Sequence, residues 1–339
     1  MIEKKGRVVK AKEDELTCYN SGMKYLVGID SGGTKTKIWL TDLQGGKIAE
    51  KERAGASITV HSIEDSIDFL KKEVGNFLVE QGVDWSEVTL ITIGMAGLNS
   101  PEIKNEFEAA WKKVMGENQK ILAVNDTIIG LLSGSQEKRA IVQIIGTGMN
   151  CVGFNERGER AKAGGIDYVG DQGASFEVGY QAVRAAVAAA DGRHPPTVLT
   201  DLIKTQFGFK NWANWIVEIC GEKWQKAVFG KVGQLVMEAA PTNQSDWVIQ
   251  KIIQETIEEN FLATKAVATK LGLDQGPTDV VWIGGLIQNH QAILKTPLEN
   301  KLRTQVNPDF NFIVPTQPPV AGAIVLARLF LAKQADFYL

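Results

Sequence analysis

The residues best suited to chemistry lie in a short segment that combines an aspartate with a glycine turn. Asp30 ends the apolar run 25–29, and a second apolar run follows the turn and ends at residue 40. The turn residues are Gly32, Gly33, Thr34, Lys35 and Thr36. Glycines permit positive φ and a close approach to the backbone, and a carboxylate beside many N–H donors suits a metal–phosphate complex. The alternative is a β-hairpin whose glycines serve only its turn.

Two further aspartates occupy positions that are typical of ligand sites. Asp126 follows the buried run 121–124, so it and Asp30 both come at the carboxyl end of a strand, where open α/β sheets bind ligands. Asp171 lies in the glycine-rich segment 163–175, which has no apolar periodicity and is therefore predicted to be a functional loop. A structural turn or cap is the alternative role for Asp171.

The strand–turn–strand unit that contains Asp30 occurs a second time. The run 140–145 is followed by the turn Gly146-Thr147-Gly148 and by the run 150–154. Reuse of one supersecondary element predicts two related half-molecules, whose donor-rich tips would form a clamp for a polyphosphate. Two unrelated hairpins are the alternative interpretation.

Apolar periodicity predicts the elements that must position these groups. Helical spacing predicts helices at 61–81, 101–114, 176–190, 247–271 and 319–332, and residues 198–271 are mostly helical by pattern. Short apolar runs predict strands at 25–29, 47–53, 88–93, 121–124, 140–145, 150–154, 279–283 and 312–314. Helices that alternate with strands in this way indicate an α/β fold. The tryptophan-rich stretch 212–224 is predicted to supply core or interface aromatics.

The composition argues against several classes of protein. A net charge of −3 over 339 residues offers no basic face for nucleic acid, and no apolar run reaches the ~18 residues of a membrane-spanning helix. The three cysteines (Cys18, Cys151, Cys220) are too widely spaced for a disulfide framework or a cysteine zinc site, and the histidines show no ligand spacing. A reducing cytoplasm is the simplest compartment. Residues 1–22, rich in Lys and Glu, are predicted to be a flexible leader.

Six motifs, in order along the chain, resemble the N-acetylglucosamine kinase group of the BadF/BadG/BcrA/BcrD ATPase family, in the actin–hexokinase–Hsp70 superfamily. They are GIDSGGTKT, VNDTIIG, IIGTGMNCVGF, GGIDYVGDQGASFEVG, WIGGLIQN and PVAGAIVLA, and the resemblance covers residues 24–330. It implies an α/β fold of two duplicated ribonuclease-H-like domains with ATP and sugar in the cleft between them. The domains are expected at 23–127 and at 128–316 with a helical insertion, and the closing helix 317–339 is expected to pack back on the first.

The resemblance also implies a role for each matching residue. Asp30 would hold Mg²⁺, through water, beside the phosphate-binding residues Gly32 to Thr36, and Asp126 matches the catalytic aspartate. The other matches are Thr147 and Gly148 for nucleotide and sugar, Asn150, Gly165 and Asp171 for the sugar, and Gly284, Gly285, Gly322 and Ala323 for the adenosine. Phosphoryl transfer needs such positioning, Mg²⁺ and a base that accepts the proton of the acceptor hydroxyl. A homodimer is also implied.

The implied reaction is transfer of the γ-phosphoryl group of ATP to a hydroxyl, the 6-OH, of an amino sugar or N-acetylated hexosamine such as N-acetylglucosamine or glucosamine. Three positions depart from the family pattern. Ile166 replaces a Trp, Gln172 replaces an acidic residue, and segment 55–59 lacks the Asn expected near the amide of the sugar. The phosphate motifs are intact, so the sequence predicts an ATP-dependent kinase and leaves its sugar open.

Other functions remain on the same fold. An ATPase activator of a radical dehydratase or reductase would hold an iron–sulfur cluster between two subunits with cysteines at glycine-rich loops, and only Cys151 lies near such a loop. A non-catalytic sugar or nucleotide sensor would have no need of a base at Asp126. A Walker-type NTPase is disfavoured because no GxxxxGK[ST] motif occurs.

Overall fold

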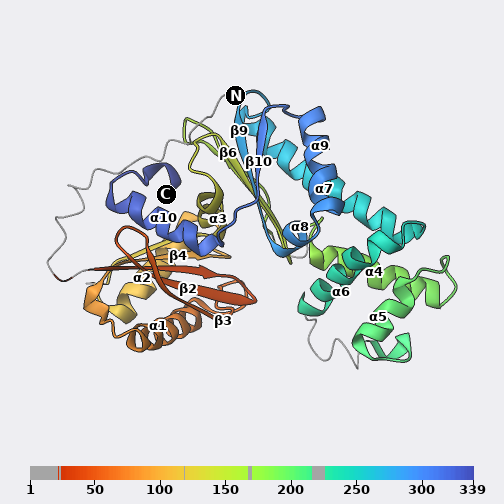
Figure 1. The fold of residues 1–339 in the computed structure, drawn as a ribbon. Coiled ribbons are helices and arrows are strands. Elements are labelled where there is room, and N and C mark those ends of the chain that lie inside the picture. The colour runs from red at the N-terminus through yellow and green to blue at the C-terminus, as the bar shows by residue number, and fades with distance from the viewer. Residues whose placement is uncertain (1–21, 23, 118, 167–169, 216–225) are drawn as a thin grey trace. The chain divides into compact units, whose positions relative to one another are not determined.

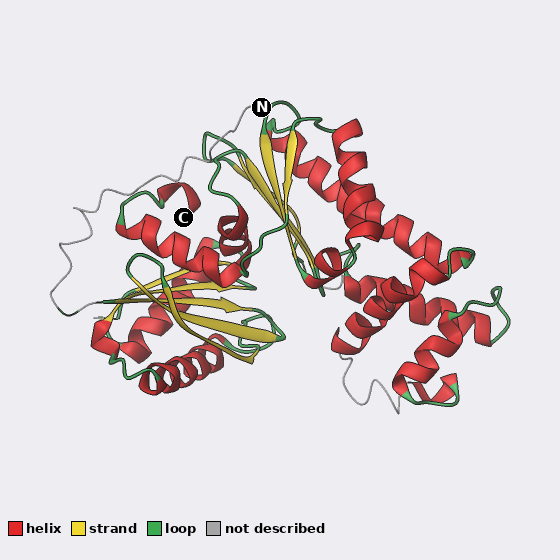
Figure 2. Cartoon of the chain, viewed as in Figure 1, coloured by secondary structure: helices red, strands yellow, loops and turns green. Residues whose placement is uncertain are grey.

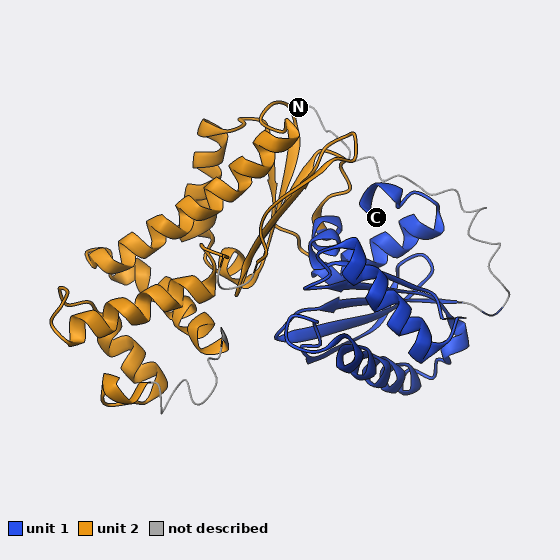
Figure 3. Ribbon diagram, turned by 180° about the vertical axis from the view of Figure 1, so that it is seen from behind, with its two compact units in different colours: residues 1–133, 317–339 blue, residues 134–316 orange. Residues whose placement is uncertain are grey.

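The chain divides into two compact units, each built around one sheet (Figures 1 and 2). Unit 1 contains Met1–Ser133 and Gln317–Leu339, and unit 2 contains Gly134–Thr316 (Figure 3). The structure, a computed structural model, describes residues 22, 24–117, 119–166, 170–215 and 226–339. The predicted leader, Cys18, Cys220 and most of the tryptophan-rich stretch therefore lie outside the described residues.

The sheet of unit 1 has the strand order β3-β2-β1-β4-β5. Its strands are β1 (Tyr25–Ser31), β2 (Lys35–Asp42), β3 (Lys47–Ala54), β4 (Val88–Met95) and β5 (Ile121–Asn125). The first three strands are antiparallel, whereas β4 and β5 run parallel to β1. Ser31 is paired with Met95, and Met95 is paired with Asn125. These three residues therefore form one row at the carboxyl ends of three neighbouring strands.

Helices cover both faces of this sheet (Figure 1). They are α1 (Ile63–Glu80), α2 (Pro101–Met115), α3 (Asp126–Gly134) and α10 (Pro319–Leu331), with short turns η2 (Trp85–Glu87) and η7 (Asp336–Tyr338). The apolar stripes of α1 and α2 bury Phe77, Phe107 and Trp111 against one face, and each such side chain stabilises the fold by about 1.5–3 kcal/mol. The other face receives α10, because Gly28 on β1 leaves room for Ile324.

The sheet of unit 2 repeats the arrangement of unit 1. Its order is β10-β9-β6-β7-β8. Its strands are β6 (Ala140–Ile145), β7 (Met149–Phe154), β8 (Arg160–Gly164), β9 (Thr278–Ile283) and β10 (Phe310–Ile313). The three consecutive strands β6, β7 and β8 are again antiparallel, and the two later strands again run parallel to the first. This common topology confirms the predicted pair of duplicated α/β domains.

Unit 2 carries more helix than unit 1. Its helices are α4 (Ser175–Ala190), α5 (Leu199–Phe207), α6 (Lys226–Ala239), α7 (Trp247–Leu271), α8 (Gly285–Asn289) and α9 (Thr296–Gln305), with short turns η3 (Trp212–Asn214), η5 (Ala240–Thr242) and η6 (Gln291–Lys295). Helix α7 packs on the sheet, where Gly153 of β7 faces Val267 and Leu271. Helices α4 and α6 cross so closely that a Cβ at Gly179 would overlap the Phe229 carbonyl.

The structure confirms most of the predicted elements and corrects several. The helices predicted at 61–81, 101–114, 176–190, 247–271 and 319–332 and most strands occur within a few residues of the predicted bounds. The predicted loop 163–175 begins too early, because Ala163 and Gly164 belong to β8, and the last strand begins at Phe310. Helices α3 and α9 and strand β8 were not predicted. The expected domain boundary after residue 127 falls inside α3.

No helix within the described ranges is both long and apolar enough to span a bilayer.

Candidate active site

The two aspartates of unit 1 that the sequence singles out, Asp30 and Asp126, flank the row of strand ends. Asp30 is paired with Gly94 on β4, one residue before the row, and Asp126 is the first residue of α3, one residue after it. Both side chains are half-buried. Two strand spacings separate β1 from β5, about 10 Å across the sheet. The fold therefore brings the two predicted carboxylates to the same edge of one sheet.

The Asp30 carboxyl has an unusual affinity for protons. Its pKa is raised from 3.8 to about 7, first by burial and then by the negative charge of Asp126, while Lys35 and Lys37 oppose the shift. A carboxylate that is desolvated beside a second carboxylate is stabilised by a bound cation. Mg²⁺ commonly uses one or two carboxylates together with phosphate oxygens, so this pair fits Mg²⁺. Over the described ranges no cluster of three or more His, Cys, Asp or Glu is placed to hold a metal ion by itself.

The turn between β1 and β2 is open to another group. The Gly32 N–H donates to the Lys35 carbonyl at 3.0 Å. Neither Gly32 nor Gly33 has positive φ, so the expected use of that conformation is wrong. A Cβ on either glycine would meet no protein atom closer than 3.6 Å. Neither backbone strain nor packing within the protein requires glycine here, which is the arrangement expected where a ligand approaches the backbone.

The other residues of this turn differ in exposure. Gly33, Thr34 and Lys35 are exposed. Thr36 is fully buried, and its hydroxyl is hydrogen-bonded to that of Ser31 at 3.2 Å. The structure therefore places three of the five predicted phosphate-binding residues at the surface of the turn, whereas Gly32 is half-buried and the Thr36 side chain lies inside it.

A segment after β3 supports the turn from behind. The Gly55 N–H donates to the Thr34 carbonyl at 3.1 Å, and the Ser57 N–H donates to the Gly32 carbonyl at 3.3 Å. A Cβ at Gly55 would overlap the Gly33 carbonyl. Sequence reasoning considered this segment only for a missing Asn and did not predict its support of the turn. Gly55 itself was the available signal.

Close packing of α3 fixes the position of Asp126. A Cβ at Gly94 would overlap the Ile129 side chain, and a Cβ at Gly322 would overlap the Ile129 carbonyl. Helix α3 is thus held between β4 and α10 by two glycines. At its start, Asn125 Oδ1 accepts from the Thr127 N–H at 3.1 Å, and Asn125 Nδ2 donates to Asn99 at 3.0 Å. Sequence reasoning missed Gly94 and Asn99.

The predicted nucleotide residues of unit 2 gather at the ends of β6 and β9. The Ser175 and Phe176 N–H groups at the start of α4 donate to the Gly146 and Thr147 carbonyls at 2.9 and 3.1 Å. Thr147 and Gly148 are exposed. Gly284 has φ +109°, and a Cβ there would overlap the Ile145 carbonyl. Gly285 follows as the first residue of α8.

Gly322, in contrast, lies in unit 1 with Ala323, on a helix that packs against β1 and α3. The close approach of the Ile129 carbonyl explains why residue 322 is a glycine, and this packing role is independent of any nucleotide.

The predicted sugar residues of unit 2 also lie together. A Cβ on Gly165, which has φ +70°, would lie 2.7 Å from Asn150 Oδ1. Asp171 is buried, accepts the Ile166 N–H at 2.9 Å, and has its other oxygen 3.2 Å from the position of a Cβ on Gly148. Asn150 Oδ1 is buried without a hydrogen-bond partner in the described part of the chain. This oxygen is a suitable acceptor for a ligand hydroxyl or N–H.

The electrostatics of Asp171 differ from those of Asp30. Burial raises the pKa of Asp171, while N–H groups of Ile166, Gly165 and Met149 and the charge of Lys162 oppose that shift. Lys162 on β8 also donates to the Gly165 carbonyl at 3.2 Å. Sequence reasoning missed Lys162 because β8 was not predicted, so its orientation toward this cluster could not be inferred.

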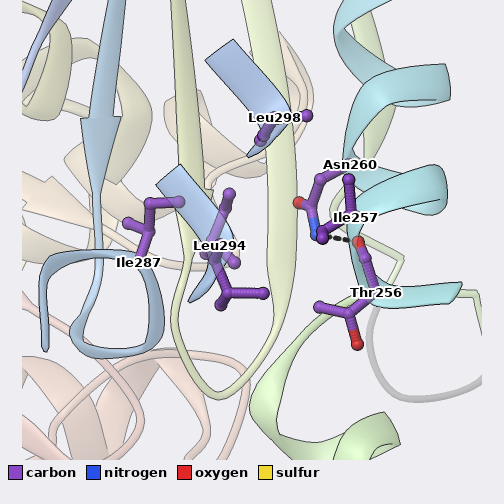
Figure 4. Close-up of a pocket in the computed structure, with 7 residues that line it drawn as sticks. Thr256, Ile257, Asn260, Ile287, Leu294 and Leu298 are labelled. Carbon is purple, nitrogen blue, oxygen red and sulfur yellow. Dashed lines mark hydrogen bonds between the residues drawn. The ribbon is translucent and has the colours of Figure 1, made fainter. Parts of the chain in front are cut away.

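A separate narrow space lies in the core of unit 2 (Figure 4). It is lined by Ile145, Thr256, Ile257, Asn260, Ile287, Leu294 and Leu298. The lining contains no titratable side chain, and both polar residues are hydrogen-bonded within the protein. This space is therefore a feature of the core and contributes no catalytic group.

Comparison with known proteins places this chain in a family. Residues 27–327 match the BadF/BadG/BcrA/BcrD ATPase family, so the chain belongs to that family. An N-acetylmuramic acid/N-acetylglucosamine kinase of Clostridium acetobutylicum is 29% identical over 90% of this chain and 99% of the relative. An N-acetyl-D-glucosamine kinase of Dictyostelium discoideum is 28% identical over 89% of this chain and 97% of the relative.

A solved structure from Chromobacterium violaceum, provisionally named N-acetylglucosamine kinase, has the same fold. It superposes with a TM-score of 0.72 at 21% identity and covers 90% of this chain and 99% of the other.

Proposed function

We propose that this protein is an ATP-dependent sugar kinase that phosphorylates the 6-OH of an amino sugar or N-acetylated hexosamine. The observation that supports the proposal most strongly is the pair Asp30 and Asp126 at one sheet edge, beside a glycine turn that is open without any structural need for glycine. Both full-length relatives carry the names of N-acetylglucosamine kinases, and the family is one of ATPases.

In this proposal the residues of unit 1 accept the proton and bind the phosphates and the metal ion. Asp126 accepts the proton of the attacking sugar hydroxyl as the bond to phosphorus forms. Its position at the start of α3 suits a carboxylate, because a helix N-terminus favours negative charge. Backbone N–H groups of Gly33 to Lys35 would bind the ATP phosphates, with Gly32 and Thr36 of the same turn beside them.

Asp30 would hold Mg²⁺, through water. The ion would neutralise the charge of the phosphates when bound. Lys35 and Lys37, whose charges already act on Asp30, would keep the turn attractive to an anion.

Residues of unit 2 are assigned to the uncharged parts of the substrates. Asn150, Gly165 and Asp171 would bind sugar hydroxyls, Thr147 and Gly148 would contact both substrates, and Gly284 and Gly285 would contact the adenosine. Gly322 and Ala323, also predicted to contact the adenosine, are both buried, and Gly322 packs against Ile129. Ile166 is 70% exposed beside this cluster, so the position where relatives place a Trp carries an aliphatic surface here. A homodimer in a reducing cytoplasm completes the proposal.

The competing activator function is disfavoured by Cys151. This thiol is fully buried, and burial raises its pKa to about 12. A buried, protonated thiol is a poor ligand for an iron–sulfur cluster shared between subunits. The purified kinase should accordingly be colourless and free of iron.

A coupled ADP-release screen tests the proposed function. The purified protein would be given ATP and Mg²⁺ with a panel of hexoses, amino sugars and N-acetylated sugars, including N-acetylglucosamine, glucosamine and N-acetylmuramic acid. We expect sugar-dependent ADP release, with mass spectrometry showing a sugar monophosphate. Failure of every sugar to raise ADP release above the sugar-free rate would contradict the proposal.

A further inference from the structure

We infer that Asn260, on α7, is a positioning residue that holds Asp171 in place. Asn260 is 2% exposed, and its Nδ2 donates to the Gly173 carbonyl at 2.7 Å. Gly173 comes two residues after Asp171 in the sequence and has φ +75°. The contact joins a rigid helix to the loop that carries a proposed sugar-binding carboxylate.

Every polar atom of the Asn260 side chain is used. The second Nδ2 hydrogen bond goes to the Thr256 carbonyl of the same helix at 2.8 Å. Oδ1 accepts from Gln143 Nε2 at 2.9 Å. Buried amides with complete hydrogen bonding fix one arrangement, because any displacement leaves a polar group unsatisfied.

Gln143 extends this anchor to the sheet. It lies on β6, close to the Gly146–Gly148 turn, and its Oε1 accepts from Thr264 at 2.8 Å and from Trp282 on β9 at 3.2 Å. Its Nε2 also donates to the Asn260 backbone carbonyl at 3.1 Å. Asn260 therefore connects the strands that precede the proposed nucleotide residues with the loop that follows the proposed sugar residues.

The geometry around Gly173 shows how the anchor reaches Asp171. A Cβ on Gly173 would lie 2.6 Å from Asn260 Nδ2 and 3.2 Å from the Thr256 carbonyl. On its C-terminal side, the loop is fixed where the Ser175 N–H donates to the Gly146 carbonyl. Asp171 precedes both points and is held on its N-terminal side by its own hydrogen bond to the Ile166 N–H. Loss of the Asn260 anchor at Gly173 would leave Ser175 as the next fixed residue on the C-terminal side of Asp171.

Asn307 offers a matched control. It is also fully buried, and its Nδ2 also donates to two backbone carbonyls, those of Leu273 and Gly276, at 2.8 and 2.9 Å. Those carbonyls precede β9, whereas Gly284 follows it, so Asn307 supports the opposite end of the strand. Asn260→Ala and Asn307→Ala therefore remove equivalent buried amides, only one of which supports Asp171.

The first experiment is kinetic and rests on the proposed function. With N-acetylglucosamine as the varied substrate, Asn260→Ala should raise KM for the sugar by about tenfold or more, the effect of one unsatisfied buried group. The KM for ATP should stay within about twofold of wild type. The reason is that Gln143 keeps its hydrogen bonds to Thr264, to Trp282 and to the Asn260 backbone carbonyl. Asn307→Ala should lower Tm and leave both KM values unchanged. Equal rises in sugar KM for the two variants would overturn the inference.

The second experiment does not need the reaction. Hydrogen exchange, followed by mass spectrometry on peptides that contain Ile166, should be faster in Asn260→Ala and unchanged in Asn307→Ala. Unchanged exchange in Asn260→Ala would overturn the inference, even if the wild type phosphorylates no sugar and the proposed function fails. Should Asn260→Ala not fold, Gly173→Ala disturbs the same contact from the loop side. Gly173→Ala should then show the same rise in hydrogen exchange. Unchanged exchange in that variant would equally overturn the inference.

Discussion

The two units present the same strand–turn–strand element at the same place in the same sheet topology, yet they surround it with different chemistry. In unit 1 the turn at Gly32 and Gly33 is open, and two carboxylates stand at the neighbouring strand ends. In both units carbonyls of the turn accept N–H groups from a later segment, which is residues 55–57 in unit 1 and the start of α4 in unit 2. In unit 2, however, the carboxylate beside the turn, Asp171, is buried among backbone N–H donors.

This difference indicates a division of roles between duplicated halves. In unit 1 the negative charge of Asp126 adds to burial in raising the pKa of Asp30. Unit 2 has a fixed carboxylate and, at Asn150, an amide oxygen with no hydrogen-bond partner among the described residues, and both suit the hydroxyls of a neutral ligand. We therefore expect substitutions in the two units to impair different properties.

The largest effect is expected from Asp126→Asn. An amide cannot accept the proton of the sugar hydroxyl, so kcat should fall by about 10²–10⁴-fold. MgATP binding, measured by calorimetry, should remain close to wild type. Asp171→Asn serves as the comparison, since it should act mainly on the KM for the sugar. Retained turnover in Asp126→Asn would remove Asp126 from its proposed role.

A smaller effect is expected from Gly33→Ala. The methyl group fits the fold, because its nearest neighbour would be 3.6 Å away and the backbone does not have positive φ. It would occupy space that the proposal reserves for phosphate, and KM for ATP should rise by about tenfold. Gly75→Ala, inside α1 with Trp85 at 3.5 Å, is the control and should leave KM unchanged. An unaltered KM in Gly33→Ala would break the assignment of the turn.

A third effect concerns stability and does not involve catalysis or binding. Because the folded pKa of Asp30 is about 7 and its ordinary pKa is 3.8, the folded protein binds the proton more tightly than the unfolded chain. Stability is therefore lost as pH rises from about 4 to 7. Asp30→Asn should raise the free energy of unfolding of the ligand-free protein at pH 8 by on the order of 2–4 kcal/mol.

Thermal unfolding between pH 4 and 8 measures this effect. The increase in the free energy of unfolding that Asp30→Asn causes should become smaller as pH falls toward 4. Asp68→Asn, on an exposed position of α1, is the matched control for removal of one charge. A gain that did not depend on pH would show that burial and Asp126 do not govern the protonation of Asp30.

Much of this arrangement is predictable from sequence, and the rest depends on tertiary contacts. Continuous apolar runs and helical spacing locate β1, β4 and α7, because burial on a sheet imposes those patterns. Strand β8 escapes prediction because its alternating apolar residues, Ala161 and Ala163, are small and alanine has a low preference for strands. The close packing of Gly94 and Gly322 on Ile129, and the Asn260 contact with Gly173, join residues distant in sequence. A single sequence carries no signal for such pairs.

The division of roles is tested most directly by measuring two affinities on two variants. Calorimetry would give the Kd of MgATP and of N-acetylglucosamine for Gly33→Ala and for Asp171→Asn. The account predicts a crossed pattern in which Gly33→Ala weakens MgATP alone and Asp171→Asn weakens the sugar alone, each by about tenfold or more. Variants that each weaken both ligands, or that show the reverse pattern, would contradict it.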